Sequence, residues 1–250
     1  MMNNFSYSRP RTLADAASQL AKEPAKAAVL AGGTDLLGEM KDALATPEIL
    51  VPIRHLPDLQ GITVTSGGLR IGAATLLADV VEHAMVQERA PLLAMAAGKI
   101  GTPQIRNMGT IGGNLCQRPR CWYYRNNFPC YKHGGNTCFS NAGENDYHAI
   151  LEGGPSYIVH PSDSAPALVA LGASVHISNG SKERTVPIDQ FFVTPKQNPR
   201  RENILVPGEI LTAIDVPTAP AGSKAVYVKE MVDRKSTRLN SSHVKRSRMP

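Results

Sequence analysis

The spacing of apolar and polar positions predicts an α/β unit at the start of the chain. Apolar residues recur at helical spacing over residues 13–21, with Thr12 as the N-cap. Short apolar runs at 27–30 and 48–53 predict two buried strands, and the segment 36–44 between them predicts a helix. Strands separated by a helix indicate a small parallel α/β arrangement.

The pattern then changes to one typical of antiparallel strands with helices. Residues 62–73 alternate apolar and polar on both sides of Ser66-Gly67-Gly68, and residues 175–188 do so around Asn179-Gly180, which predicts two hairpins. The remaining expected elements are helices at 75–86 (with Thr75 as cap), at 91–100, and from a cap at Ser162 or Asp163 to Leu171, and strands at 157–159, 210–216 and 224–232. The predicted fold class is therefore α+β, with a parallel unit first and an antiparallel unit second.

Composition limits the class of protein. The chain has 250 residues, of which 42% are hydrophobic and 19% charged, as is ordinary for a soluble globular protein. No apolar run approaches the ~18 residues of a membrane span, and the start, MMNNFSYSRPR, lacks the apolar stretch of a secretory signal. We therefore expect no membrane insertion.

The positive charge is concentrated at the end of the chain. The net charge is +6, and five of the 27 Lys and Arg residues lie in residues 235–250, which contain no Asp or Glu. The rest of the chain has 22 basic and 21 acidic residues, a net charge of +1. A nucleic-acid-binding face on the folded part is therefore not expected. The segment resembles translated sequencing-adapter sequence, so we expect a non-native, disordered tail after a reading frame lost near Arg234.

Two glycine turns are candidate phosphate-binding elements. The first is Ala31-Gly32-Gly33-Thr34-Asp35-Leu36, and the second is Thr110-Ile111-Gly112-Gly113-Asn114. Paired glycines let a backbone approach a ligand closely, and successive N–H groups can form a concave site for phosphate oxygens. Either turn alone is better explained as an ordinary tight turn. Neither matches GxGxxG or the P-loop pattern, which excludes a Rossmann or P-loop site.

All four cysteines lie in one segment rich in Gly, Asn, Pro and Arg. Cys116, Cys121, Cys130 and Cys138 are separated by four, eight and seven residues, in what we expect to be an irregular loop. Two disulfides, a four-thiolate zinc site and an iron-sulfur cluster are all possible. The close CxxC pairs of structural zinc are absent, but spacing alone does not choose between zinc and a cluster.

Taken together, AGGTDLL, TIGGNL and the later His160-Pro161-Ser162-Asp163 resemble the FAD-binding medium subunit of the molybdenum hydroxylases, the xanthine dehydrogenase and carbon monoxide dehydrogenase group. The resemblance covers roughly residues 3–234. It implies a two-lobed, PCMH-type FAD-binding fold with lobes at 1–58 and 59–220, the second carrying a cysteine-rich loop at 116–156. Residues 221–234 then start a C-terminal domain that is largely missing.

The resemblance also implies a set of FAD-binding residues. Asp163 is expected on the adenosine side, with a helix cap as its ordinary alternative, and Lys229 near the flavin ring, with a solvated strand lysine as its alternative. The full set is Leu30, Ala31, Gly32, Gly33, Thr34, Asp35, Leu36, Gly109, Thr110, Gly112, Gly113, Asn114, Asp163 and Lys229.

The cysteine segment narrows the resemblance further. NLCQRPRCWYYRN and PCYKHGGNTC are similar to the subgroup with an extra [4Fe-4S] cluster in this subunit, which includes the flavin subunits of periplasmic aldehyde oxidoreductase and 4-hydroxybenzoyl-CoA reductase. This implies Cys121, Cys130 and Cys138 as ligands, with Cys116 as the expected fourth. Members of the subgroup have a cysteine where this chain has Ser156, and a Ser hydroxyl is a poorer iron ligand than a thiolate.

The implied function is that of an oxidoreductase subunit. It would pass electrons from iron-sulfur clusters to FAD and on to an acceptor, next to a molybdopterin-binding large subunit and a [2Fe-2S] small subunit. The cofactor supplies the redox chemistry, so no catalytic acid, base or nucleophile is expected in this chain. We expect a cytoplasmic location, or a periplasmic one if a partner subunit is exported with it. The alternatives are a stand-alone flavin oxidase and a zinc-stabilised binding module without redox activity.

Overall fold

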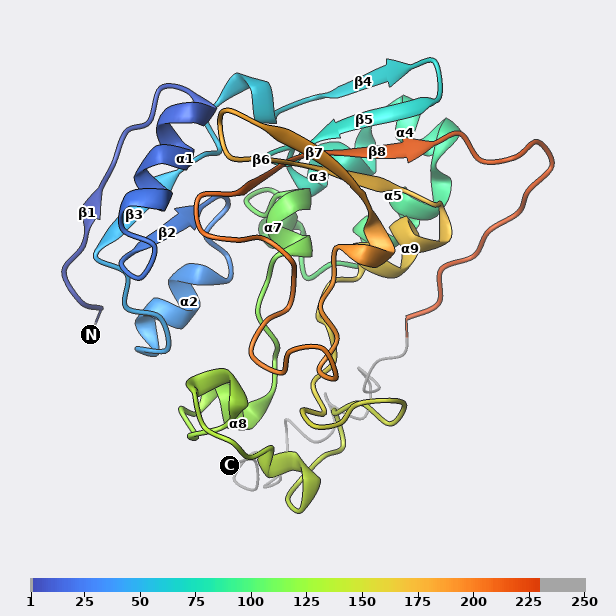
Figure 1. The fold of residues 1–250 in the computed structure, drawn as a ribbon. Helices are drawn as coiled ribbons and strands as arrows, with labels where there is room; N and C mark the ends of the chain where they lie inside the picture. Colours follow the sequence, from blue (N-terminus) through green and yellow to red (C-terminus); the bar gives the residue numbers. More distant parts are fainter. Residues whose placement is uncertain (1, 230–250) are drawn as a thin grey trace.

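The chain folds into two lobes, each built around its own sheet (Figure 1). The structure is a computed structural model, and it describes residues 2–229. The small lobe has a parallel sheet in the order β1-β3-β2, and the large lobe has an antiparallel sheet in the order β4-β5-β8-β6-β7. The predicted α+β class, with a parallel unit before an antiparallel one, is confirmed.

The small lobe follows the predicted alternation of strands and helices. Its elements are β1 (Ser6–Tyr7), α1 (Leu13–Lys22), β2 (Ala27–Leu30), α2 (Leu36–Lys41) and β3 (Ile49–Pro52). Thr12 caps α1 by accepting a hydrogen bond from the Asp15 amide at 3.1 Å. β1 was not predicted, because a strand of two exposed residues has no apolar pattern.

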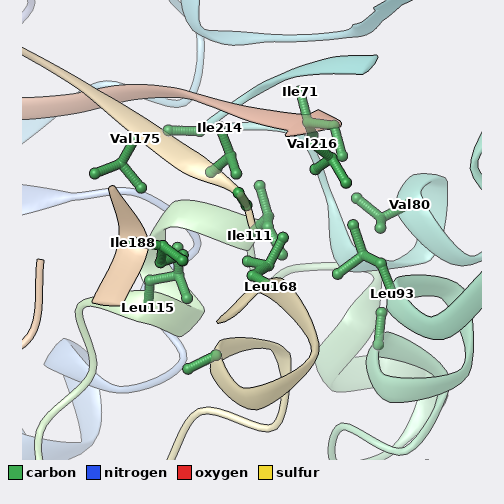
Figure 2. Packing of buried hydrophobic residues seen from close by; sticks show 14 of the residues in the cluster. Ile71, Val80, Leu93, Ile111, Leu115, Leu168, Val175, Ile188, Ile214 and Val216 are labelled. Carbon is green, nitrogen blue, oxygen red and sulfur yellow. The ribbon is translucent and has the colours of Figure 1, made fainter. Parts of the chain in front are cut away.

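The large lobe packs helices on one face of its five-stranded sheet. Its strands are β4 (Ile62–Thr65), β5 (Gly68–Gly72), β6 (Ser174–Ser178), β7 (Glu183–Pro187) and β8 (Ile210–Pro217), and its helices are α3 (Leu77–Glu82), α4 (Ala84–Arg89), α5 (Pro91–Gly98), α6 (Pro103–Arg106), α7 (Ile111–Leu115) and α9 (Ser164–Ala170). Figure 2 shows Ile71, Ile214 and Val216 of the sheet facing side chains of these helices, such as Leu93 and Leu168. Both predicted hairpins are present.

Several predicted boundaries were wrong for local reasons. The helix expected to reach residue 44 ends at Lys41, because Ala43 takes a left-handed backbone conformation with φ of 56°. The helix expected over 75–86 is broken into α3 and α4 by the extended backbone of His83. Thr75 does not cap it; its hydroxyl donates to the Gly61 carbonyl at 3.1 Å.

The predicted strand at 157–159 is not a strand, and residues 224–229 of the last predicted strand are also irregular. Residues 230–232 of that strand, and the predicted tail at 235–250, lie outside the described residues. None of the helices within residues 2–229 is both long and apolar enough to cross a bilayer.

Most of the cysteine-rich loop at 116–156 extends away from the large lobe, as a segment that we call the cysteine excursion (Figure 1). It is less irregular than predicted, because the second glycine turn forms α7 and the segment contains α8 (Trp122–Arg125) and two short 3-10 turns. Tyr123, Phe128 and Phe139 pack their rings together within it. The excursion thus has a small aromatic centre separate from the two lobes.

Candidate functional site

A cleft of about 520 Å³ lies where the two lobes meet, a volume in the range of small-molecule and cofactor sites. Both glycine turns line it, together with α7 and the start of α9. Twelve of the fourteen predicted cofactor residues are on its wall: Ala31, Gly32, Gly33, Thr34, Asp35, Leu36, Gly109, Thr110, Gly112, Gly113, Asn114 and Asp163. The structure therefore brings together two motifs that lie far apart in the sequence.

The first glycine turn offers hydrogen-bond donors to the cleft. The backbone N–H groups of Gly32, Gly33, Thr34 and Asp35 have no acceptor among residues 2–229. The turn follows β2 and leads into α2. Consecutive free amides in such a turn are suited to the oxygens of a diphosphate.

The second glycine turn uses its amides internally. Ile111 and Gly112 donate to the carbonyls of Thr75 and Ala73, and Gly113 donates to the Thr110 hydroxyl at 3.1 Å. A Cβ on Gly112 would lie 2.7 Å from the Ala73 Cβ. This turn is glycine-rich because it packs closely, so the two turns are not equivalent as donors.

Asp163 lies on the cleft wall and pairs with Lys229. The two side chains are 2.6 Å apart, and the Tyr227 hydroxyl donates to the other carboxylate oxygen at 3.3 Å. Asp163 does not cap α9 with its side chain; the hydroxyl of Ser162 accepts from the Ala165 amide instead. Lys229 therefore reaches the cleft only through Asp163.

Leu30, the other predicted residue that is not on the cleft wall, lies behind it, where its side chain packs against Gly33. The buried amide of Asn114, by contrast, is on the wall and accepts a hydrogen bond from the Ser162 hydroxyl at 2.6 Å. This bond joins the second glycine turn to the start of α9.

Asp35 joins the cleft to the cysteine excursion. Its carboxylate accepts from the Arg118 amide at 2.7 Å and from the Arg125 side chain at 2.9 Å, and it is also paired with Arg120. Burial alone would raise the pKa of Asp35, but these hydrogen bonds and positive charges outweigh it and hold the pKa below its ordinary value. The Asp35 side chain is thus ionised, and its oxygens accept hydrogen bonds from the cysteine excursion.

Arg118 and Arg120 line the cleft, although neither was predicted as a site residue. Both lie between Cys116 and Cys121, where the sequence drew attention to sulfur, and their position on the cleft depends on a contact with Asp35 more than 80 residues away. Glu39, also on the wall, accepts a 2.8 Å hydrogen bond from Tyr124 of the excursion. Both Arg side chains are paired with carboxylates, Arg118 with Glu202 and Arg120 with Asp35. The free amides of the first glycine turn are therefore the feature that suits the cleft to an anionic ligand.

Three of the four cysteines surround a second, small cavity. Cys121, Cys130 and Cys138 line it together with Ser156, and its free volume is about 10 Å³. Ser156 is 3% exposed and Cys130 is 7% exposed. The cavity as it stands has room for about one water molecule.

Cys116 is not among the residues that surround this cavity. It lines the large cleft and packs against the core of the large lobe. Burial raises the pKa of its thiol to about 12, so the thiol stays protonated at neutral pH. The expected grouping of all four cysteines is therefore split into three and one, because α7 carries Cys116 into the large lobe.

Polar groups surround two of the three grouped sulfurs. His148 Nε2 lies 3.2 Å from Cys121 Sγ, Ser140 Oγ lies 3.1 Å from Cys138 Sγ, and the Tyr157 amide donates to Cys138 Sγ at 3.4 Å. All four cysteines are free in the structure, and none of them is paired in a disulfide. Residues 2–229 contain no group of three or more His, Cys, Asp or Glu placed to hold a single metal ion.

A comparison with known protein families identifies the family of this chain. The model of the FAD binding domain in molybdopterin dehydrogenase matches residues 3–219. The chain belongs to this family. Among curated relatives, the aldehyde oxidoreductase FAD-binding subunit PaoB of Escherichia coli (strain K12) is 37% identical over 233 residues, which is 91% of this chain and 72% of PaoB. The carbon monoxide dehydrogenase medium chain of Hydrogenophaga pseudoflava is 32% identical over 226 residues, 90% of this chain and 63% of that one.

Solved structures of the family have the same fold. A structure of the Cu,Mo-containing CO dehydrogenase superposes with a TM-score of 0.66 at 28% identity, covering 89% of this chain and 62% of that chain. The chain thus spans between about three fifths and three quarters of these relatives. The family inferred from the two glycine turns and the His160-Pro161-Ser162-Asp163 motif is confirmed, and the two relatives are an FAD-binding subunit and a medium chain.

Proposed function

We propose that this chain binds FAD in the cleft between its lobes and serves as the flavoprotein subunit of a molybdenum hydroxylase complex. The observation that carries the proposal is the row of free backbone amides from Gly32 to Asp35 on the cleft wall. A dinucleotide needs such donors for its diphosphate. The family to which the chain belongs supports the choice of FAD.

Different residues of the cleft would bind different parts of FAD. The first glycine turn would donate to the diphosphate oxygens, and Arg118 and Arg120 would offset their negative charge. Asp163, held by Lys229 and Tyr227, would accept from the adenosine side. When bound, FAD accepts and passes on electrons. The residues of the cleft wall would hold it in one orientation.

We further propose an iron-sulfur cluster in the cysteine excursion, held by Cys121, Cys130 and Cys138. Three thiols that converge on one cavity have the donor chemistry of such a site. The cavity is small, so these side chains have to turn outward to admit a cluster. The aromatic residues packed beside them would limit access of water.

The partners proposed are a molybdopterin-binding large subunit and a [2Fe-2S] small subunit, with the acceptor taking electrons from FAD. The printed names of the relatives, an aldehyde oxidoreductase subunit and a carbon monoxide dehydrogenase medium chain, support a complex of this kind. Residues 1–58 and 59–220 are proposed as the two FAD-binding lobes. The location follows that of the partner subunits.

Binding of flavins to the purified chain, stripped of cofactor, tests the proposal. FAD should bind at one molecule per chain, and its flavin fluorescence should fall on binding. Riboflavin, which has no diphosphate, should bind at least 10-fold more weakly. Replacing Arg120 with Gln should weaken FAD but not riboflavin, and Arg89→Gln, at the end of α4, is the matched control. Equal affinity for FAD and riboflavin would show that the cleft does not recognise the diphosphate. A colourless protein that holds zinc would favour the binding-module alternative instead.

A further inference from the structure

We infer that Ser156, not Cys116, occupies the fourth corner of the iron-sulfur site, so that one iron is bound through oxygen or left without a protein ligand. This inference rests on the proposed cluster. The structural observation is that Ser156 lines the same small cavity as Cys121, Cys130 and Cys138, whereas Cys116 lines the large cleft.

The backbone holds Ser156 beside the thiols. The amide of its neighbour, Tyr157, donates to Cys138 Sγ at 3.4 Å, and the Tyr157 carbonyl accepts from the Ala149 amide at 2.9 Å. These two bonds fix the chain on the C-terminal side of Ser156. With 3% of its surface exposed, Ser156 faces the interior of the excursion and not the solvent.

Cys116 is held in a different part of the molecule. Its amide donates to the Gly112 carbonyl at the end of α7, and its side chain packs on the large-lobe core. To reach the other cysteines, Cys116 would have to leave that core, and α7 would have to unwind. Four residues between Cys116 and Cys121, anchored at Arg118 and Arg120 by Asp35, cannot relax without breaking those bonds.

The chemical consequence is an iron that differs from its three neighbours. Thiolates are soft and readily deprotonated, whereas a Ser hydroxyl must lose a proton of much higher pKa to bind iron. The iron beside Ser156 is therefore the most easily lost. Mild oxidation with ferricyanide removes one electron from a [4Fe-4S]²⁺ cluster and releases one Fe²⁺, which leaves [3Fe-4S]⁺.

The experiment compares variants of the full chain, purified without oxygen and then treated with ferricyanide. Iron and acid-labile sulfide are measured per chain, and the oxidised [3Fe-4S] form is followed by EPR. The natural chain should fall to about three irons with about four sulfides and give the [3Fe-4S] signal. Ser156→Cys should keep about four irons and lose most of that signal.

Three control variants separate this change from general effects of a new or lost thiol. Ser174→Cys, at the start of β6 in the large lobe, adds a thiol far from the cavity and should behave as the natural chain. Cys116→Ser should leave the iron content unchanged, while Cys130→Ser should abolish it. Circular dichroism and thermal unfolding, measured on the same samples, report that each variant is folded.

The outcomes also separate this inference from the proposed cluster. If the natural chain holds a cluster but Ser156→Cys retains no more iron than Ser174→Cys, or if Cys116→Ser loses iron, Ser156 is not at the fourth corner. If the natural chain binds FAD but no iron or sulfide, and Cys130→Ser changes nothing, both the cluster and the inference fail, while the FAD proposal stands.

Discussion

Gly32 lies where the first glycine turn touches the segment leading into the second. A Cβ built on Gly32 would lie 2.0 Å from the Met108 carbonyl oxygen and 2.9 Å from the Gly109 Cα. Both are backbone atoms, which cannot turn aside as a side chain can. The glycine is therefore needed for the approach of the two turns as well as for access by a ligand.

We expect Gly32→Ala to lower the free energy of unfolding by about 1–3 kcal/mol, the usual effect of forcing an extra methyl into a packed site. It should also displace the two turns and reduce FAD binding. Gly38→Ala is the control, because that glycine lies in α2 with nothing within 4 Å. The control should gain up to about 1 kcal/mol. Urea unfolding measures both; equal stability of the two variants would show that the turns move apart freely.

His160 is kept neutral by its surroundings. Burial lowers the pKa of its imidazole to about 4. The ring stacks edge-on against Phe192 with centroids 4.6 Å apart, and Nε2 is buried without a hydrogen-bond partner within residues 2–229. Nδ1 accepts a hydrogen bond from the Ser162 amide at 3.3 Å, so the neutral ring carries its proton on Nε2. A second proton, on Nδ1, would break that bond and leave a buried charge.

The folded chain should therefore lose stability as pH falls from about 6.5 towards 4, because the unfolded chain takes up this proton and the folded chain does not. The slope from one such group approaches about 1.4 kcal/mol per pH unit. His160→Gln, which is neutral throughout, should show a shallower loss over the same window. Unfolding by urea at a series of pH values gives both curves, and parallel curves would rule out His160 as the source.

At the scale of elements, the cysteine excursion is attached to the rest of the fold by two buried carboxylates, Glu39 and Glu202, and by the half-buried carboxylate of Asp35. Asp35 and Glu39 from the small lobe bind Arg125, and Glu202, from the segment between β7 and β8, binds Arg118 at 3.0 Å and Lys132 at 2.6 Å. Buried ion pairs of this kind position elements more than they stabilise them. The excursion is thus held at both lobes.

Asp35→Asn should loosen the excursion, because the variant loses the charge that orders Arg120 and Arg125. We expect a loss of about 1.5–3 kcal/mol from the charged hydrogen bonds and faster tryptic cleavage after Arg120 and Arg125; the bond after Arg118 precedes Pro119 and resists trypsin. Asp42→Asn, at the exposed end of α2, is the matched control and should leave cleavage unchanged. Identical cleavage of the two variants would contradict an anchoring role for Asp35.

At the scale of the whole molecule, the two lobes share part of their interior. The core of the small lobe contains Leu56 and Leu59 from the connection between the lobes, and also Ala74 and Ile210 from the large lobe. Ile210 is the first residue of β8, the central strand of the large sheet. The lobes should therefore unfold together.

Ile210→Ala tests this coupling. A cavity at this site should lower the unfolding free energy by about 2–4 kcal/mol, and hydrogen exchange should speed up in β3 of the small lobe as well as in β5. Val64→Ala, on an exposed position of β4, should have little effect. Faster exchange confined to the large lobe would mean that the small lobe is stable by itself.

The class of the fold could be predicted from the sequence, because period-2 and period-3.6 patterns and turn residues act locally. The sequence also identified both glycine turns and the group of cysteines, since these are contiguous motifs. Three features could be seen only in the folded chain: Arg118 and Arg120 line the cleft, the amides of the second turn already have acceptors, and Ser156 lies with three cysteines while Cys116 does not. These depend on contacts between residues tens of positions apart, such as Asp35 with Arg118 and Cys138 with Tyr157, for which no local pattern exists.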